Sequence, residues 1–116
     1  MAKHLKTGIE GEQLAVDYLI QNKYVILHRN WRKGHLEVDI IASKDEILHF
    51  IKVKTKTTNH YGFPEEAVTK IKFKYLVSAA NLYLIQNPHW ERIQFDVLAI
   101  TLKPEICYFL IEDVYL

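Results

Sequence analysis

The chain has 116 residues, of which 49% are hydrophobic and 25% are charged, and its formal net charge is +1 at pH 7. These values are typical of one globular domain, here residues 1–116, and no apolar run approaches the ~20 residues of a membrane span. The lone cysteine, Cys107, excludes an internal disulfide and a cysteine-based zinc site. The first residues show no signal-peptide pattern, so we expect a cytoplasmic protein without membrane contacts.

The small net charge hides an uneven distribution along the chain. Basic residues are in excess over the first two thirds, and six lysines between positions 52 and 74 are opposed by only two glutamates. They are Lys52, Lys54, Lys56, Lys70, Lys72 and Lys74, against Glu65 and Glu66. Such a cluster permits contacts with phosphate groups, although a lysine-rich solvated face is an equally good interpretation.

The first predicted element is a helix from about Thr7 to Gln21. Its apolar stripe has helical spacing and consists of Leu14, Ala15, Tyr18 and Leu19. Thr7 and Glu10 form a capping-box pattern, which predicts Thr7 as the N-cap. Gly8 and Gly11 are unfavourable choices in a helix, so we expect another element to pack closely against this turn.

A strand is predicted next, from Tyr24 to Trp31, and its end combines cations with an aromatic ring. The segment is Arg29-Asn30-Trp31-Arg32-Lys33. This composition suits a phosphate backbone with a base stacked on the indole. The alternative is a tryptophan at a sheet edge, covered by the aliphatic stems of the arginines.

Two further strands joined by a short polar turn carry paired charges. They span about residues 36–42 and 47–54, with the turn at 43–46. Alternation with a period of two places Glu37 and Asp39 on one face of the first strand, and Lys52 and Lys54 on one face of the second. Burying such charges without partners costs several kcal/mol. The alternative is a solvated face whose cross-strand ion pairs are worth about 0.2–1 kcal/mol each.

The remaining elements follow a polar loop over residues 55–64. They are a helix over about residues 69–85, with Ile71, Tyr75, Leu76, Ala79, Leu82 and Tyr83 facing inward, and strands over about 90–100 and 106–111. Pro64 suits a helix N1 position, followed by Glu65 and Glu66 in the first turn. The order of elements predicts an α/β fold in which helices cover a mixed sheet, with the parallel pairing across the helical connection.

Several motifs in unbroken order resemble one known family. They are Gly8-x-x-Gly11-Glu12-x-x-Ala15, Arg29-Asn30-Trp31-Arg32, Gly34-x-x-Glu37-Val38-Asp39-Ile40-Ile41-Ala42, Phe50-Ile51-Lys52-Val53-Lys54-Thr55, Gly62-x-Pro64-x-x-Ala67-Val68 and Phe95-Asp96-Val97. From about Gly8 to Ile100 the chain resembles the YraN family of small bacterial proteins, within the PD-(D/E)XK, restriction endonuclease-like superfamily and similar to archaeal Holliday junction resolvases. The resemblance implies a three-layer α/β/α fold with a central mixed five-stranded sheet.

The same resemblance implies a magnesium-dependent phosphodiesterase site on the hairpin. Carried over by position, Glu12 is a helix glutamate that assists catalysis, Asp39 is a metal ligand, and Lys54 polarises the phosphate or the attacking water. Carboxylate oxygens are the ligands that magnesium prefers, and the ion would activate water and stabilise charge on the phosphate.

Lys52 departs from the family pattern, which has Glu-x-Lys where this chain has Lys52-Val53-Lys54. The exchange removes an anion and adds a cation beside the metal position. One opposed charge pair at ~4 Å and an effective dielectric constant of ~20 is worth about 4 kcal/mol. We therefore expect magnesium binding to be weakened or absent, with Glu37, on the face of Asp39, as the candidate replacement ligand.

Three hypotheses remain open from the sequence. The first is a protein with a nuclease-like fold that binds nucleic acid, in the first instance DNA, with phosphate contacts from Lys52, Lys56, Arg29, Arg32, Lys70 and Lys74. The second is an active magnesium-dependent, structure-specific DNA endonuclease that uses Asp39, Lys54, Glu12 and Glu37. The third is a protein-interaction domain with no nucleic-acid role, as a homodimer through the tyrosine-rich second helix or the last strand.

Overall fold

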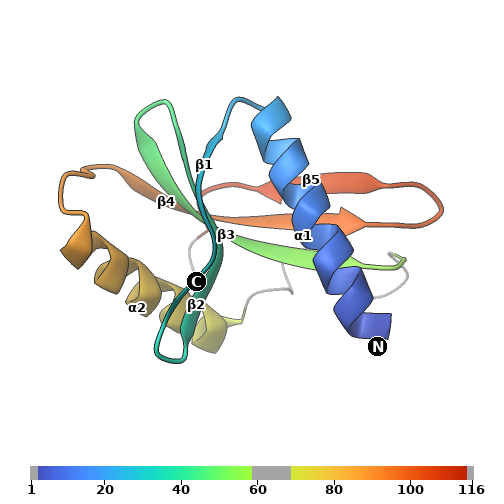
Figure 1. Ribbon diagram of the computed structural model, residues 1–116, viewed down its shortest axis with the longest axis horizontal. Helices are drawn as coiled ribbons and strands as arrows, with labels where there is room; N and C mark the ends of the chain where they lie inside the picture. Colours follow the sequence, from blue (N-terminus) through green and yellow to red (C-terminus); the bar gives the residue numbers. More distant parts are fainter. Residues whose placement is uncertain (1–2, 59–68, 115–116) are drawn as a thin grey trace.

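A computed structural model defines residues 3–58 and 69–114 of the chain, with side chains from residue 8 onward. Its elements are helix α1 (Lys3–Gln21), strands β1 (Val25–Lys33), β2 (Leu36–Lys44) and β3 (Ile47–Lys56), helix α2 (Lys70–Gln86), and strands β4 (Ile93–Thr101) and β5 (Cys107–Ile111), shown in Figure 1. The prediction for Pro64, Glu65 and Glu66 lies outside the described residues. Neither described helix is long and apolar enough to cross a membrane.

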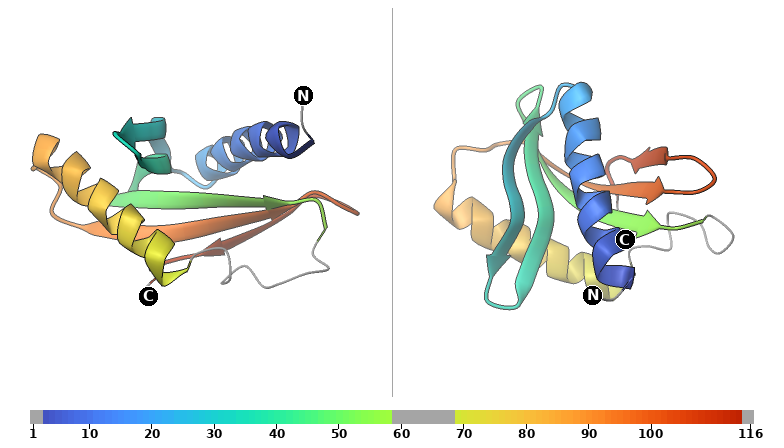
Figure 2. Two further views of the ribbon diagram at one scale, coloured as in Figure 1. Left: turned by 90° about the horizontal axis from the view of Figure 1, so that it is seen from below. Right: turned by 45° about the vertical axis from the view of Figure 1, so that its right-hand side comes forward.

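The five strands form one mixed sheet in the order β1-β2-β3-β4-β5. Strands β1, β2 and β3 are antiparallel neighbours, β5 is antiparallel to β4, and β3 and β4 run parallel. The parallel pair is the one connected through α2, because a helical crossover returns the chain to the same end of the sheet. Figure 2 shows the β1–β2 hairpin turned strongly relative to β3, β4 and β5, as the twist of a sheet requires.

The two helices cover opposite faces of this sheet, so the fold has three layers (Figures 1 and 2). On one face Leu19 of α1 packs in the same core as Ile40. On the other face Leu76 and Tyr83 of α2 pack in the same core as Ile41. Neighbouring residues of β2 thus serve both cores, as in a strand buried on both faces. The predicted three-layer α/β fold with a mixed five-stranded sheet is confirmed.

Helix α1 differs from its prediction at its first turns. It begins at Lys3, so the prediction of Thr7 as N-cap is wrong. The residues before Thr7 contain no helix-breaking glycine or proline, and the helix therefore extends through them. At Gly11 the expected close packing is confirmed, because a Cβ there would lie 1.9 Å from Thr55 Oγ1 of β3. At Gly8 it is wrong, since nothing lies within 4 Å of the Cβ position.

Helix α2 is packed through a different stripe from the predicted one. Ile71 and Tyr75, predicted to face inward, are 66% and 55% exposed, whereas Ala80 is buried and Phe73 packs against the core. Apolar residues surround much of this helix, so more than one stripe has helical spacing and tertiary packing selects between them. Thr69 caps the helix by accepting the Lys72 N–H at 3.2 Å.

The turn between β2 and β3 is shorter than predicted. Ser43 and Lys44 belong to β2, so only Asp45 and Glu46 connect the strands, with φ values of 53° and 66°. Positive φ at both central residues is the geometry of a two-residue hairpin turn whose twist matches that of the strands. The hairpin that carries Asp39 and Lys52 is therefore tightly closed at this end.

Candidate functional site

Asp39 lies at the place where β2 and β3 stop pairing. Their antiparallel ladder ends with Ile40 opposite Ile51, and the N–H of Val53 donates to Asp39 Oδ2 at 2.7 Å. The carboxylate thus takes the role that a backbone carbonyl of β2 would have in a longer ladder. A hydrogen bond from a backbone amide to a charged oxygen is strong and directional, so it fixes this side chain at the open end of the hairpin.

Lys52 forms an ion pair with this carboxylate. Its Nζ lies 3.3 Å from Asp39 Oδ2, and the side chains are 40% and 15% exposed, respectively. The charged faces that alternation placed on β2 and β3 separately thus meet at this pair. Burial raises the pKa of the Asp39 carboxyl, and the Lys52 ammonium and the Val53 hydrogen bond oppose this rise without cancelling it. The charge on Asp39 therefore depends on its cationic neighbour.

The described side chains around Asp39 do not fit a magnesium ion. Magnesium requires several oxygen ligands at short distance, and within residues 8–58 and 69–114 no group of three or more His, Cys, Asp or Glu side chains could hold a metal. Oxygen Oδ2 of Asp39 already faces a backbone donor and an ammonium. The candidate replacement, Glu37, is held by Arg32 at 2.7 Å between Oε2 and Nε. The Lys52 ammonium therefore lies beside Asp39, where a magnesium ion would need a second carboxylate ligand.

A pocket of about 430 Å³ opens beside Lys52, between the β1–β2 turn and α2. Its lining residues are His35, Leu36, Glu37, Lys52, Lys72, Tyr75 and Leu76. Lys72 was not among the predicted binding residues, although its spacing of three from Tyr75 places both on one side of a helix. The sequence could thus predict that Lys72 and Tyr75 share a side of α2. It could not predict that the packing of α2 on β2 brings Lys72 to the pocket that Lys52 lines.

Glu12, the predicted catalytic glutamate, is engaged with β1. Its Oε1 accepts from Arg29 Nη2 at 3.1 Å, and its Oε2 accepts from Asn30 Nδ2 at 2.8 Å. Asn30 has a φ of 50°, which turns its amide out of the regular pattern of the strand. No hydrogen bond or ion pair in the described part of the chain joins Glu12 to Asp39. These contacts tie α1 to the edge strand.

The aromatic and basic segment at the end of β1 is partnered by the protein itself. Arg29 and Arg32 form ion pairs with Glu12 and Glu37, and the Trp31 ring meets Tyr83 edge-on with 5.5 Å between the ring centroids. Trp31 also packs against the core under α2. These contacts favour the interpretation of a tryptophan at a sheet edge over that of a base-stacking ring.

The other predicted phosphate-binding lysines divide between two elements. Lys54 and Lys56 follow Lys52 along β3 at intervals of two residues, on the same face of the strand. Lys70 and Lys74 are exposed on α2 and are not among the residues that line the pocket. The structure therefore brings Lys52 together with Asp39 and Lys72, and leaves Lys70 and Lys74 apart from them.

A buried polar cluster escaped the sequence interpretation. His49 Nδ1 lies 2.6 Å from Asp96 Oδ2, with both side chains at most 4% exposed. Oxygen Oδ1 of Asp96 accepts from Gln94 Nε2 and from the N–H of Asp113, each at 2.9 Å. Burial, followed by the charge of Asp96, raises the pKa of Tyr24 to about 12. The only local signal was a histidine within the apolar strand β3, which does not reveal its partner.

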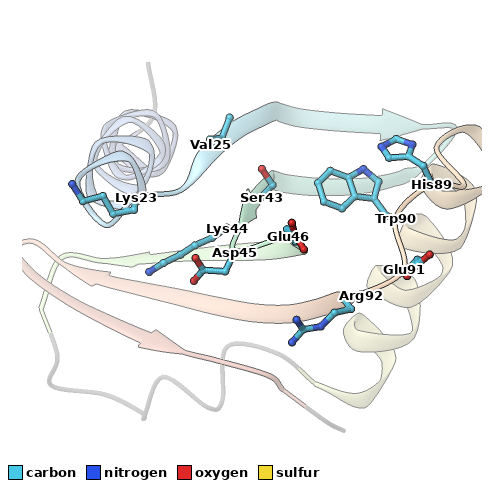
Figure 3. A pocket seen from close by; sticks show the side chains of 10 residues that line it. All are labelled: Lys23, Val25, Ser43, Lys44, Asp45, Glu46, His89, Trp90, Glu91 and Arg92. Atoms are coloured by element: carbon cyan, nitrogen blue, oxygen red, sulfur yellow. The ribbon is translucent and has the colours of Figure 1, made fainter.

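A second pocket, of about 520 Å³, lies near the β2–β3 turn and is drawn in Figure 3. In this view the Lys23 and Lys44 amines lie at one end and the Trp90 ring lies at the other. The lining includes three cations, Lys23, Lys44 and Arg92, and three acids, Asp45, Glu46 and Glu91. Because these charges compensate one another, this pocket offers a polyanion less attraction than the pocket beside Lys52.

Comparison with known proteins identifies relatives over most of the chain. The model of uncharacterised protein family UPF0102 matches residues 11–100. A UPF0102 protein of Bacteroides fragilis is 43% identical over 100 residues, covering 86% of this chain and 83% of the relative. A UPF0102 protein of Chloroherpeton thalassium is 39% identical over 125 residues, covering 99% and 97%, and one of Rhodococcus opacus is 43% identical over 101 residues, covering 86% of each.

Proposed function

The chain belongs to uncharacterised protein family UPF0102, the YraN family, and we propose that it binds nucleic acid through its nuclease-like fold without a bound metal ion. The observation that carries this proposal is the distance of 3.3 Å between Lys52 Nζ and Asp39 Oδ2. An ammonium at this place supplies the positive charge that a metal ion would otherwise supply to a phosphate group.

The surroundings of Lys52 support a phosphate rather than a neutral ligand. Lys52 and Lys72 line one pocket from two different elements, and two ammonium groups around one hollow attract an anion. Lys52 is 40% exposed, so an approaching phosphate can reach it without displacing the core. The acids of this site, Asp39 and Glu37, each already face a cation of the protein.

Binding and its salt dependence test this proposal directly. We expect fluorescence anisotropy with a forked DNA, in the presence of a chelator, to show an affinity that falls steeply between about 50 and 200 mM salt. Lys52→Ala and Lys72→Ala should each weaken binding and reduce the salt slope by roughly one. Lys23→Ala, which removes a lysine from the charge-balanced pocket, serves as the matched control. Absence of binding at low salt would reject the proposal and favour a protein-interaction domain.

Cleavage with magnesium distinguishes a binding protein from an active endonuclease. We expect the natural chain to leave branched DNA intact, because Lys52 opposes a metal ion beside Asp39. Cleavage by Lys52→Glu alone would identify a binding protein derived from a nuclease. If the natural chain cleaves the DNA and Asp39→Ala abolishes this cleavage, the site is catalytic despite Lys52. The metal-free proposal would then be wrong.

A further inference from the structure

Three strands align a column of lysines with a column of small residues and a column that contains an aromatic ring. In the register of β3, β4 and β5, Lys52 lies beside Val97 and Ile111, Lys54 beside Ala99 and Phe109, and Lys56 beside Thr101 and Cys107. We call these nine residues the lysine–phenylalanine face. Residues in register on adjacent strands point to the same side of a sheet, so all nine belong to one surface.

This surface lies on the side of the sheet away from α1. The alternate residues of β4, Leu98 and Ile100, are buried in the core that α1 covers. Val97 packs with Phe73 of α2, and with Ile111 and Val114, so the first of the three rows is covered in part by α2. In Figure 1, α2 lies at the end of β4 opposite to the β4–β5 turn. In the second row Phe109 is 54% exposed.

The chemistry of the second row suits one nucleotide. Lys54 makes no ion pair with any residue whose side chain the structure defines, and the nine residues include no acid. From β3 to β5 the face spans about 10 Å, twice the spacing of neighbouring strands. A phosphate at Lys54 would place the attached sugar and base across Ala99, whose small side chain leaves room, and towards the ring of Phe109.

We propose that the lysine–phenylalanine face binds an unpaired stretch of nucleic acid, with a phosphate at Lys54 and a base stacked on Phe109. The inference rests on the proposed nucleic-acid function and names its substrate class. A base within a duplex is already covered by its neighbours on both faces, whereas an unpaired base has a free face for an aromatic ring. A second copy of the chain fits this face less well, because it would bring its own lysine column with it.

The test compares a single strand with the duplex of the same sequence, for the natural chain and three variants. We expect the natural chain to prefer the single strand at equal salt. Phe109→Ala should weaken single-strand binding by about 5- to 150-fold with an unchanged salt slope, and Phe109→Tyr should retain it, because the ring and not the charge is altered. Lys54→Ala should instead lower the salt slope by roughly one. Ile85→Ala, at a 74% exposed apolar residue of α2, is the matched control.

The sole cysteine, Cys107, gives a second readout on the same face. It is exposed in the third row, so a bound single strand should slow its reaction with a maleimide more than the duplex does. One outcome would overturn this inference alone. In that outcome Phe109→Ala binds the single strand as tightly as the natural chain, while Lys54→Ala and Lys52→Ala still weaken binding. Loss of a dimer in Phe109→Ala with unchanged nucleic-acid affinity would assign the face to a second copy. No binding of either nucleic acid would overturn both proposals.

Discussion

The face of the sheet under α1 and the lysine–phenylalanine face partner their polar groups differently. On the face under α1, Asp96 Oδ1 accepts hydrogen bonds from the Gln94 side chain and from the Asp113 backbone amide. Its other oxygen, Oδ2, faces His49 Nδ1. Glu12 joins two residues of β1 at the margin of the same helix. On the opposite face Lys54 has no ion-pair partner with a defined side chain, and Phe109 is 54% exposed. The first face uses these polar groups to hold elements together, whereas Lys54 and Phe109 on the second face hold no described elements together through an ion pair.

Two polar residues of the quoted motifs, Glu12 and Asp39, have partners of different kinds in the structure. Glu12 belongs to a motif that the resemblance associates with catalysis, yet its carboxylate holds α1 to β1. Asp39, from a later motif, is positioned by one amide and by the ammonium of Lys52, which lines a pocket. Stability measurements should therefore respond most to changes under α1, and binding measurements to changes on the lysine–phenylalanine face.

The largest expected effect is that of Asp96→Ala. The change leaves His49 buried without its partner and removes the acceptor for the Asp113 amide. Breaking a buried pair of this kind costs about 3–5 kcal/mol in the free energy of unfolding, which urea denaturation would measure. Asp96→Asn, which retains an acceptor, should lose less, and Asp17→Ala, at an exposed residue of α1, should change stability by less than about 0.5 kcal/mol. A loss below about 1 kcal/mol for Asp96→Ala would contradict a structural role.

Gly11→Ala tests the contact between α1 and β3. The added Cβ would lie 1.9 Å from Thr55 Oγ1 and 2.8 Å from Thr55 Cβ, so α1 or β3 must shift. Overpacking of this kind costs about 1–3 kcal/mol in unfolding free energy. Gly8→Ala is the matched control because its Cβ position is open, and alanine should stabilise the helix there by up to about 1 kcal/mol. Equal effects of the two changes would show that α1 does not contact β3 as described.

Glu12→Gln tests whether Glu12 serves to hold α1 against β1 or to take part in binding and catalysis. The amide keeps the shape of the side chain but loses the charge that faces Arg29. We expect a loss of about 1 kcal/mol in unfolding free energy, because this pair is partly exposed. The affinity for nucleic acid should stay within about twofold, since the contact lies at the α1 margin of β1. A large loss of affinity at unchanged stability would place Glu12 in the binding site.

The smallest effect is expected for Asp39→Asn, and its sign depends on pH. Burial holds the pKa of Asp39 above its ordinary value, so the native state binds more protons than the unfolded state between the two pKa values. Stability conferred at low pH is therefore lost as pH rises through this range. At neutral pH asparagine should raise the unfolding free energy by less than about 1 kcal/mol, and the gain should vanish in acid. A gain that persists below pH 3 would contradict this assignment, as would a loss at pH 7.

Much of the fold was readable from local patterns. Alternation with a period of two predicted β2 and β3 and the charged face of each strand. The meeting of Asp39 with Lys52 depends on the two-residue turn at Asp45 and Glu46, which the structure shows and the predicted turn over residues 43–46 did not give. Helix periodicity located α2 but selected Ile71 and Tyr75 as inward residues, which are exposed. A helix that is apolar over much of its circumference does not reveal which side the sheet covers. The start of α1 was missed because capping residues also occur within helices.

The sequence by itself determined the order and type of the elements, since these depend on residues close together along the chain. Only the tertiary structure decided which side chains meet. The parallel register of β3 and β4 pairs residues more than 40 positions apart, and it is this register that joins His49 to Asp96 and aligns Lys54 with Ala99 and, through β5, with Phe109. Such a register is set by how α2 and α1 pack on the sheet as a whole, which no local pattern specifies.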